Sequence, residues 1–400
     1  MELLLHIAII LTVIYTGTIV LFMAGLKIRR HGGSPERPGV SVIIAARNEE
    51  SNIKNILTDL AGQSYPKELY EVIIANDFSN DKTAEIVKQY SAQYPQIKLL
   101  DMQTIPAHYS PKKWAIQSAV GKAAGEIILV TDADCRVGSK WIEGMATYFE
   151  PDVGFVIGFS QFGARGEQQN LIERYQAFDF VTLMGAAAGT TNLGFPLAAS
   201  GQNLGYRKST FQQIGGYQKV AHRVSGDDVL LLQLVRKHTK QKIVFAANPD
   251  TYAVSEPQPT LKAFINQRKR WASNGSIQMR LNFGFFLYLM QVLLYNAVLL
   301  VGLTAALVIG RHLDMMLLCL ATRVLSEFAI AVKSAFYFNR ADLLKYFPLW
   351  VLSQMPYIVC VGLAGTFGKF RWKEREHSAR IPSTGKQLIA AEQHSADRST

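Results

Sequence analysis

Two aspartates separated by one residue follow an apolar run and are the first candidates for chemistry. Residues 127–130 read Ile-Ile-Leu-Val, which predicts a buried strand, and Asp132 and Asp134 come just after it. In an open α/β sheet ligands bind at the carboxyl ends of the strands, so we expect both carboxylates in a crevice. Carboxylate and phosphate oxygens are the ligands that Mg²⁺ or Mn²⁺ prefers. The pair predicts a divalent-cation site, and a solvated turn is the alternative when Asp-x-Asp stands alone.

Further acidic residues lie where strands end or helices begin. Asp77 follows the predicted strand 71–75, where its carboxylate can accept a hydrogen bond from a uracil ring N–H; an Asx-turn or helix cap is the alternative. Asp227 and Asp228 follow a Ser-Gly turn and precede an apolar helix. Asp228 is the predicted general base, Asp227 competes with it for that role, and a helix N-cap is the alternative for either.

Basic and aromatic residues complete the chemical candidates. Arg270 and Trp271 end an amphipathic helix, where they can clamp a pyrophosphate and stack on a sugar. A basic helix lying on the membrane surface is the alternative, because an apolar run starts soon afterwards. Lys112 and Lys113 precede the central strand, and simple solvation is the alternative for both.

Alternating strands and helices between residues 40 and 252 predict the scaffold for these residues. The pattern indicates an α/β domain with right-handed crossovers and a mostly parallel sheet. Neither a Gly-x-Gly-x-x-Gly turn nor a Walker-type loop occurs, which disfavours a dinucleotide dehydrogenase or P-loop enzyme. The predicted strands are 40–46, 71–75, 98–100, 127–130 and 153–159, and the predicted helices include 47–60, 81–90, 115–124 and 170–183.

Long apolar runs at both ends predict transmembrane helices. Residues 3–26 form a signal anchor, and basic residues directly after it place the domain in the cytoplasm and the amino terminus outside. Three later runs, 283–309, 313–338 and 343–367, are each long enough to span. Four spans would put the basic tail outside, so one late run is expected to be re-entrant or interfacial; the middle one, with Arg323 and Glu327, is the candidate.

Composition agrees with a membrane protein that handles anionic partners. Charged residues make up 18% of the chain, below the roughly 25% of soluble chains, and the net charge is +11. Nucleic acid is the competing explanation for the positive charge, but no basic stripe interleaved with aromatic residues occurs outside the membrane-flanking regions. Three cysteines without CxxC spacing indicate reduced thiols, and Cys135 is expected to be a packing residue.

These motifs together resemble the membrane-bound family 2 glycosyltransferases, which include cellulose and hyaluronan synthases and ceramide glucosyltransferase. The matching motifs occur in the same order as in that family, and the resemblance covers residues 40–271. Asn76 and Asp227 depart from it, since they stand where the family has Asp and Glu. The resemblance assigns Asn76, Asp77, Lys112, Asp132, Gln267, Arg270 and Trp271 to the nucleotide-sugar, Asp132 and Asp134 to the metal, and Asp228 and Asp227 to catalysis.

The resemblance implies a GT-A (nucleotide-diphospho-sugar transferase) domain at residues 40–275, with an anchor at 1–30 and a linker at 31–39. A membrane region of about three helices at 276–370 and a basic, then disordered tail at 371–400 complete the expected organisation.

The implied function is inverting transfer from a nucleotide-sugar, expected to be a UDP-sugar, to a lipid-linked or growing glycan acceptor. It would take place at the cytoplasmic face of the inner membrane, with Mg²⁺ or Mn²⁺ as cofactor. Membrane lipids and an optional accessory membrane protein are the other expected partners. A processive polysaccharide synthase subunit, a nucleotidyltransferase and an inactive membrane scaffold or transporter subunit are the alternatives. Few polar residues occur in the late apolar runs, which favours the addition of one or a few sugars to a lipid.

Overall fold

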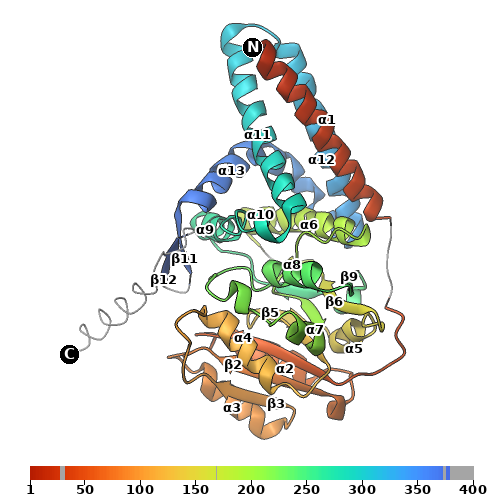
Figure 1. Cartoon of the computed structure of the whole chain (residues 1–400), viewed down its shortest axis with the longest axis vertical. Helices are drawn as coiled ribbons and strands as arrows, with labels where there is room; N and C mark the ends of the chain where they lie inside the picture. The colour runs from red at the N-terminus through yellow and green to blue at the C-terminus, as the bar shows by residue number, and fades with distance from the viewer. Residues whose placement is uncertain (28–31, 168, 373–374, 379–400) are drawn as a thin grey trace, which may run out of the picture.

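The computed structural model describes residues 1–27, 32–167, 169–372 and 375–378. Figure 1 shows a sheet-containing domain at one end of the molecule and long helices at the other, with the amino terminus at the far tip of these helices. Most of the basic cluster predicted after the anchor, and most of the predicted tail, lie outside the described residues.

The larger sheet has the strand order β3-β2-β1-β4-β8-β6-β9. Strands β1 to β4 are parallel, β8 is antiparallel to both of its neighbours, and β9 is parallel to β6. The predicted mostly parallel α/β sheet is therefore confirmed. The strands are β1 Val40–Ala46, β2 Tyr70–Asn76, β3 Ile97–Asp101, β4 Ile127–Val130, β6 Val153–Gly158, β8 Leu204–Arg207 and β9 Lys242–Ala246.

Side chains of β1 show why the sheet is buried on both faces. Val42 and Ile44 pack into the hydrophobic cluster on one face, whereas Ile43 packs into the cluster on the other. A strand that is covered on both faces must be apolar throughout, as β1 is. The helices of this domain are α2 Ile53–Ala61, α3 Thr83–Gln93, α4 Pro111–Lys122, α5 Trp141–Ala146, α7 Lys208–Gln213 and α8 Val229–His238.

A smaller sheet and short helical turns connect these elements. The smaller sheet has the order β5-β10-β7, formed by Cys135–Val137, Ala253–Ser255 and Ser160–Phe162. The single turns are η1 Lys67–Leu69, η2 Gln218–Val220, η3 Pro249–Thr251 and η4 Ala341–Tyr346. A hairpin of β11 Lys369–Trp372 and β12 Arg375–Ser378 follows the last helix, where the sequence had suggested no regular structure.

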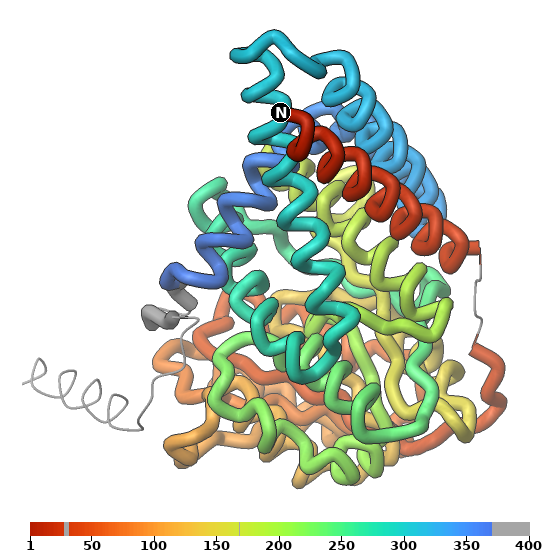
Figure 2. The backbone as a smooth tube through the Cα atoms, turned by 45° about the horizontal axis from the view of Figure 1, so that its top comes forward, coloured from red at the N-terminus to blue at the C-terminus, as the bar shows by residue number. Residues whose placement is uncertain are grey.

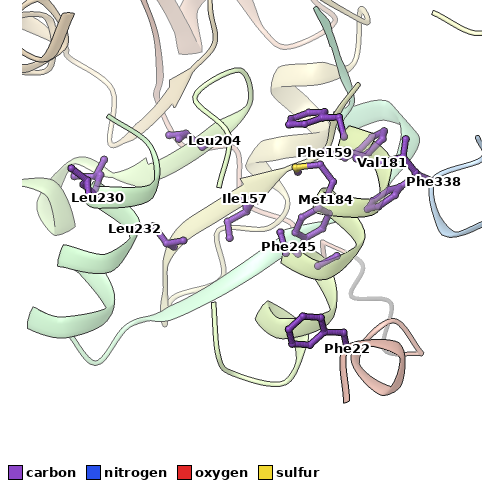
Figure 3. Close-up of a cluster of buried hydrophobic side chains, with 14 of the residues drawn as sticks. Phe22, Ile157, Phe159, Val181, Met184, Leu204, Leu230, Leu232, Phe245 and Phe338 are labelled. Carbon is purple, nitrogen blue, oxygen red and sulfur yellow. The ribbon is translucent and has the colours of Figure 1, made fainter. Parts of the chain in front are cut away.

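A layer of helices separates the sheet from the apolar helices. It consists of α6 Leu171–Asn192, α9 Leu261–Ala272 and α10 Gln278–Leu281. Figure 3 shows Val181 and Met184 of α6 in the buried cluster that also contains Phe245 of β9 and Phe22 of α1. One hydrophobic core therefore continues from the sheet, through α6, into the membrane region.

Helix α6 is longer than the predicted 170–183. Gly189 lies so close to Gly25 of α1 that an added Cβ would be 2.3 Å from the Phe22 carbonyl oxygen. Gly185 is in similar contact with Ser334. Glycines lower helix propensity, but here they permit close packing between helices, and this packing stabilises the continued helix.

Four helices are long and apolar enough to cross a membrane, within the part of the chain that the structure describes. They are α1 Glu2–Gly25, α11 Phe283–Ile309, α12 Leu313–Tyr337 and α13 Phe347–Phe367, the last being preceded by η4 within one candidate span. Their ranges agree closely with the apolar runs predicted from the sequence.

Helix α12 runs beside α1 over its whole length (Figure 2). His312, just before α12, pairs with Glu2 at the far tip (2.8 Å), and Glu327 accepts a hydrogen bond from Tyr15 halfway along (2.8 Å). Its other end reaches α6 at Ser334. Helix α12 thus extends from the tip to the helix layer, and the prediction that residues 313–338 are re-entrant or interfacial stays a prediction.

Helix α13 instead lies along the helix layer (Figure 1). Near its start Trp350 donates to Asp179 of α6 (2.9 Å), and Tyr357 stacks on Phe264 of α9. Near its end Gly365 packs against α9. Both ends of α13 therefore contact the helix layer, while α13 also packs against α11.

Candidate active site

The predicted site residues line one cavity of about 960 Å³, and only Asn76 does not. The cavity begins at the carboxyl edge of the large sheet and continues between the helices of the membrane region. Its polar residues include Asp77, Lys112, Asp132, Asp134, Asp227, Asp228, Gln267 and Arg270, and Trp271 also lines it.

Asp132 and Asp134 follow β4, as expected. Burial, the neighbouring Asp132 carboxylate and Glu49 raise the pKa of Asp134 to about 7. Glu49 follows β1, so it reaches the same edge of the sheet. Glu49 is not among the site residues predicted from the sequence, although it follows the first strand just as Asp132 and Asp134 follow β4. The site therefore concentrates negative charge, which a bound cation would stabilise.

Lys112 joins the two acidic pairs. Its ammonium lies 2.8 Å from Asp132 Oδ1 and 2.9 Å from Asp227 Oδ2. Lys112 is the second residue of α4, which begins at Pro111, and Pro at the first helical position fixes the entry of the chain. Lys112 is thus a structural part of the site, and the alternative of a simply solvated lysine is corrected.

Solvation is the alternative for Lys113 as well, and the structure corrects it, because the Lys113 side chain is fully buried. Its ammonium donates to the carbonyl oxygens of Arg223 (2.5 Å) and Ser225 (2.9 Å). Burial lowers the pKa of Lys113 to about 8. A buried ammonium needs hydrogen-bond acceptors, and here two backbone carbonyl groups supply them. The two bonds therefore fix the loop that leads to Asp227.

Asp227 and Asp228 differ in their surroundings. Burial opposes ionisation of Asp227, but Lys112 and Lys113 outweigh this effect and lower its pKa to about 2. Burial, followed by repulsion from Asp227, raises the pKa of Asp228 above its usual range. A carboxylate with a raised pKa is the better proton acceptor, so the environment favours Asp228 over Asp227 as general base.

Backbone groups hold Asp228 in place. Its carboxylate accepts hydrogen bonds from Val229 N (2.5 Å) at the start of α8 and from Gly201 N (2.9 Å). A Cβ at position 201 would lie 3.2 Å from the Asp227 carboxylate, so glycine permits this close approach. Asp228 is therefore the N-cap of α8 and remains a candidate general base, so the two interpretations of this residue are compatible.

The helix α9 presents Gln267, Arg270 and Trp271 to the cavity. Arg270 contacts Ser225 Oγ (3.4 Å), beside the acidic pair, and Trp271 packs near Phe180 of α6. Arg268, in the same motif, was not predicted. It pairs with the buried Asp179 at 2.7 Å.

This pair has a structural consequence that the sequence did not reveal. Arg268 lies over the Trp271 ring at 4.1 Å, and Asp179 also accepts from the Trp350 indole N–H. The Arg268–Asp179 pair therefore ties α9 to α6 and α13. No sequence signal links residues so far apart.

Asp77 and Asn76 follow β2 but have different positions. Asp77 is buried, lines the cavity and donates its backbone N–H to the Ala46 carbonyl oxygen (2.8 Å). Asn76 donates to Asp101 Oδ1 (2.7 Å) and accepts from Ser79 N (3.3 Å). The side chain of Asn76 is thus engaged in the turn that follows β2, and a nucleotide contact remains a prediction for Asp77.

Cys135 is buried after the Asp-x-Asp motif, in agreement with a packing role. Among the residues that the structure describes, no group of three or more His, Cys, Asp or Glu is arranged to hold a metal. Asp132 and Asp134 can still supply two hard oxygen ligands, which suits a cation whose remaining ligands are substrate phosphates and water.

The sequence profile described as Glycosyl transferase family 21 matches residues 4–383, nearly the whole chain. The chain belongs to this family. The expectation of a membrane-bound GT-A glycosyltransferase group is thereby confirmed. The match to family 21 includes the membrane helices as well as the catalytic domain.

Curated relatives and one solved structure agree with this family and fold. The chain is 28% identical over 248 residues to the probable glycosyltransferase YdaM of Bacillus subtilis, covering 59% of this chain and 55% of the relative. It is 28% identical over 250 residues to a beta-monoglucosyldiacylglycerol synthase of Synechocystis, covering 60% and 48%. The chain thus spans about half the length of these relatives.

The solved structure shows similarity of fold alone. The mannosyltransferase PcManGT from Pyrobaculum calidifontis, in complex with GDP-Man and Mn²⁺, has a TM-score of 0.57 and 18% identity to this chain. The alignment covers 90% of this chain and 98% of that one. This supports the GT-A architecture of the family 21 chain.

Proposed function

We propose that this chain is an inverting, metal-dependent glycosyltransferase that moves a sugar from a nucleotide-diphospho-sugar to a lipid hydroxyl. One observation carries the proposal: the acidic site and apolar walls formed by membrane helices line the same cavity. A polar donor and an apolar acceptor can therefore meet there. The name of the Synechocystis relative, a glucosyldiacylglycerol synthase, agrees with a lipid acceptor.

Each part of the cavity has a proposed role in the reaction. Asp77 accepts a hydrogen bond from the base, for which a uracil N–H is the expected partner. Asp132 and Asp134 would hold Mg²⁺ or Mn²⁺, and the bound cation would supply positive charge to the diphosphate. Arg270 contributes a second positive charge to the same phosphates. Gln267 and Trp271 lie beside the sugar.

Asp228 removes the proton from the acceptor hydroxyl. The hydroxyl oxygen then forms a bond to the anomeric carbon while the bond to the diphosphate oxygen breaks. Attack from the face opposite the leaving group inverts the anomeric configuration, and no covalent enzyme intermediate is needed. Gly201 N and Val229 N hold the Asp228 carboxylate in position for this transfer.

Polar residues of the membrane helices support a lipid acceptor over a secreted polysaccharide. Asn296 donates to its own helix at Val292 O (2.8 Å), and Gln354 donates to Tyr175 OH (3.2 Å). Gln291 donates to Thr18 (3.4 Å). Of these three side chains Gln354 alone is among the residues that line the cavity, so they provide little of the polar lining that a sugar chain would need to cross hydrocarbon.

The packing of α13 also supports a specific topology. We propose that α1, α11 and α12 cross the bilayer and that α13 lies at its cytoplasmic interface. Three crossings with the amino terminus outside place the catalytic domain and the basic residues after α13 on the same, cytoplasmic side, as the positive-inside rule requires. This proposal resolves the inconsistency that four crossings produced.

The test is a reconstitution of the full chain in lipid nanodiscs with a panel of labelled nucleotide-sugars and Mn²⁺. We expect release of the nucleoside diphosphate together with a labelled glycolipid, and loss of both in EDTA. A long lipid-free polysaccharide would instead support the processive alternative. No nucleoside diphosphate release with any donor would support an inactive scaffold or transporter subunit. Pyrophosphate release would indicate a nucleotidyltransferase.

A further inference from the structure

The cavity extends well beyond the acidic site, into the membrane region. Its lining includes Tyr15, Ile19 and Phe22 of α1 and Glu327 of α12. Helix α1 meets α6 at Gly25, ten residues after Tyr15, which corresponds to about 15 Å at the rise of an α-helix. The cavity therefore reaches to a depth at which the surrounding medium is hydrocarbon, and a lipid chain is the ligand that can occupy this part.

An apolar wall alone gives little selectivity among lipids. Lipid tails in the bilayer are as apolar as the side chains that line the cavity, so moving a tail between them changes little free energy. A polar group within the apolar part can discriminate far more strongly, because an unmatched polar group there is costly.

Glu327 is such a group. It is 2% exposed and lines the cavity. Its Oε1 accepts from the Tyr15 hydroxyl (2.8 Å) and lies 3.0 Å from Arg323 Nη2. Its Oε2 is buried and has no hydrogen-bond partner among the described residues. An unpartnered carboxylate oxygen in this environment is a strong acceptor that awaits a donor.

We propose that Glu327 Oε2 accepts a hydrogen bond from a hydroxyl or amide N–H on the apolar part of the acceptor lipid. Glu327 is then a specificity-determining residue, distant from the reacting atoms. This inference rests on the proposed transfer to a lipid. The Tyr15 and Arg323 contacts fix the carboxylate through Oε1, and Oε2 is left without a protein partner. A charge-assisted bond of this kind corresponds to a preference of about tenfold or more.

The experiment compares three acceptors that each carry one primary hydroxyl: dioleoylglycerol, its analogue with one ester replaced by an amide, and diricinoleoylglycerol. The first lacks a further donor, the second adds an N–H, and the third adds chain hydroxyls. The readout is the ratio of kcat/KM between lipids for each enzyme, which does not depend on the amount of folded protein. We expect the wild-type chain to prefer one of the donor-bearing lipids by about tenfold or more.

The matched variants are Arg323→Leu combined with Glu327→Leu, and Asn296→Leu. The double variant removes both charges together, so no unpaired charge remains in the bundle. It should lose the preference. Asn296→Leu also removes a buried polar group from the bundle, but Asn296 does not line the cavity. It should keep the preference.

Equal use of the three lipids by the wild-type chain would overturn the inference without needing any variant, and the proposed function would stand. An unchanged preference in the double variant would assign Glu327 a structural role only and would also overturn it. No transfer to any lipid acceptor would refute the proposed function itself.

Discussion

Replacing Asp228 by Asn tests the assignment of the general base. The change keeps the shape of the side chain but removes its ability to accept a proton. General-base catalysis contributes about 10²- to 10⁴-fold to the rate, so we expect kcat to fall by that factor, or about 3–5 kcal/mol in activation free energy. Substrate binding should change less, because Asp228 acts on the acceptor proton in the transition state.

The same change should have little effect on the free energy of unfolding. Asn loses one of the two backbone hydrogen bonds that the Asp228 carboxylate accepts, at a cost of about 1 kcal/mol. The pKa of Asp228 is raised in the folded state, so its contribution to stability is complete below the unfolded pKa and is lost as pH rises through the folded pKa. At pH 7 the raised pKa means that burial of the ionised Asp228 carboxylate destabilises the folded state, and a neutral Asn avoids this cost. The lost hydrogen bond and the avoided cost of the buried charge therefore offset each other.

Asp227→Asn is the matched control. The pKa of Asp227 is lowered to about 2, so its ionised form stabilises the folded chain above the unfolded pKa, and this contribution is lost as pH falls through about 2. At pH 7 this variant should lose about 2 kcal/mol of stability, because Lys112 also loses one of its two carboxylate partners.

The assay measures nucleoside diphosphate release with a lipid acceptor and thermal unfolding of the same preparations. A folded Asp228→Asn variant that keeps more than about a tenth of the wild-type kcat would refute the assignment of the base. So would an Asp227→Asn variant with a larger loss of kcat and unchanged stability, because that result would exchange the roles of the two residues.

Three further predictions concern the metal site, the helix layer and the topology. Since the pKa of Asp134 is about 7, protons compete with the cation below that pH, and the apparent Mn²⁺ affinity should fall about tenfold from pH 8 to pH 6; a pH-independent Mn²⁺ titration of activity would contradict this. Arg268→Met leaves the buried Asp179 without its counter-charge and should cost about 3–5 kcal/mol in thermal unfolding, whereas Arg37→Met breaks an exposed pair and should cost at most about 1 kcal/mol. In a background without native cysteines, Arg311→Cys should react with an impermeant thiol reagent on intact cells and Lys369→Cys only after permeabilisation; external labelling of Lys369→Cys would indicate that α13 crosses the bilayer.

Local sequence patterns determined the strands and the position of the acidic motifs. Apolar runs such as 40–46 and 127–130 predicted strands because residues buried on both faces of a sheet must be apolar, and the structure confirms both. Asp132 and Asp134 follow their strand by two and four residues, so the strand end fixes their place without further information. The four apolar helices were predicted for the same reason, since length and hydropathy are local properties.

Tertiary structure decided which of these residues meet and what each one experiences. Lys112 contacts Asp132 and Asp227, which are 20 and 115 positions away. Together with Lys113 it lowers the pKa of Asp227, whereas burial and repulsion from Asp227 outweigh its effect at Asp228 and raise that pKa. Local sequence could not predict this separation of roles, because burial and distant charges cause it.

The same holds for the membrane region. By hydropathy, α12 and α13 are both candidates to cross the membrane. The charged residues of α12 led to the prediction that α12 is the segment that does not cross it. The structure pairs Arg323 with Glu327, and Glu327 accepts a hydrogen bond from Tyr15, so α12 can run the full length of α1. Helix α13 instead binds the helix layer through Trp350. A charge in an apolar helix is tolerated when a partner from another segment satisfies it, and only the folded chain shows which partner that is.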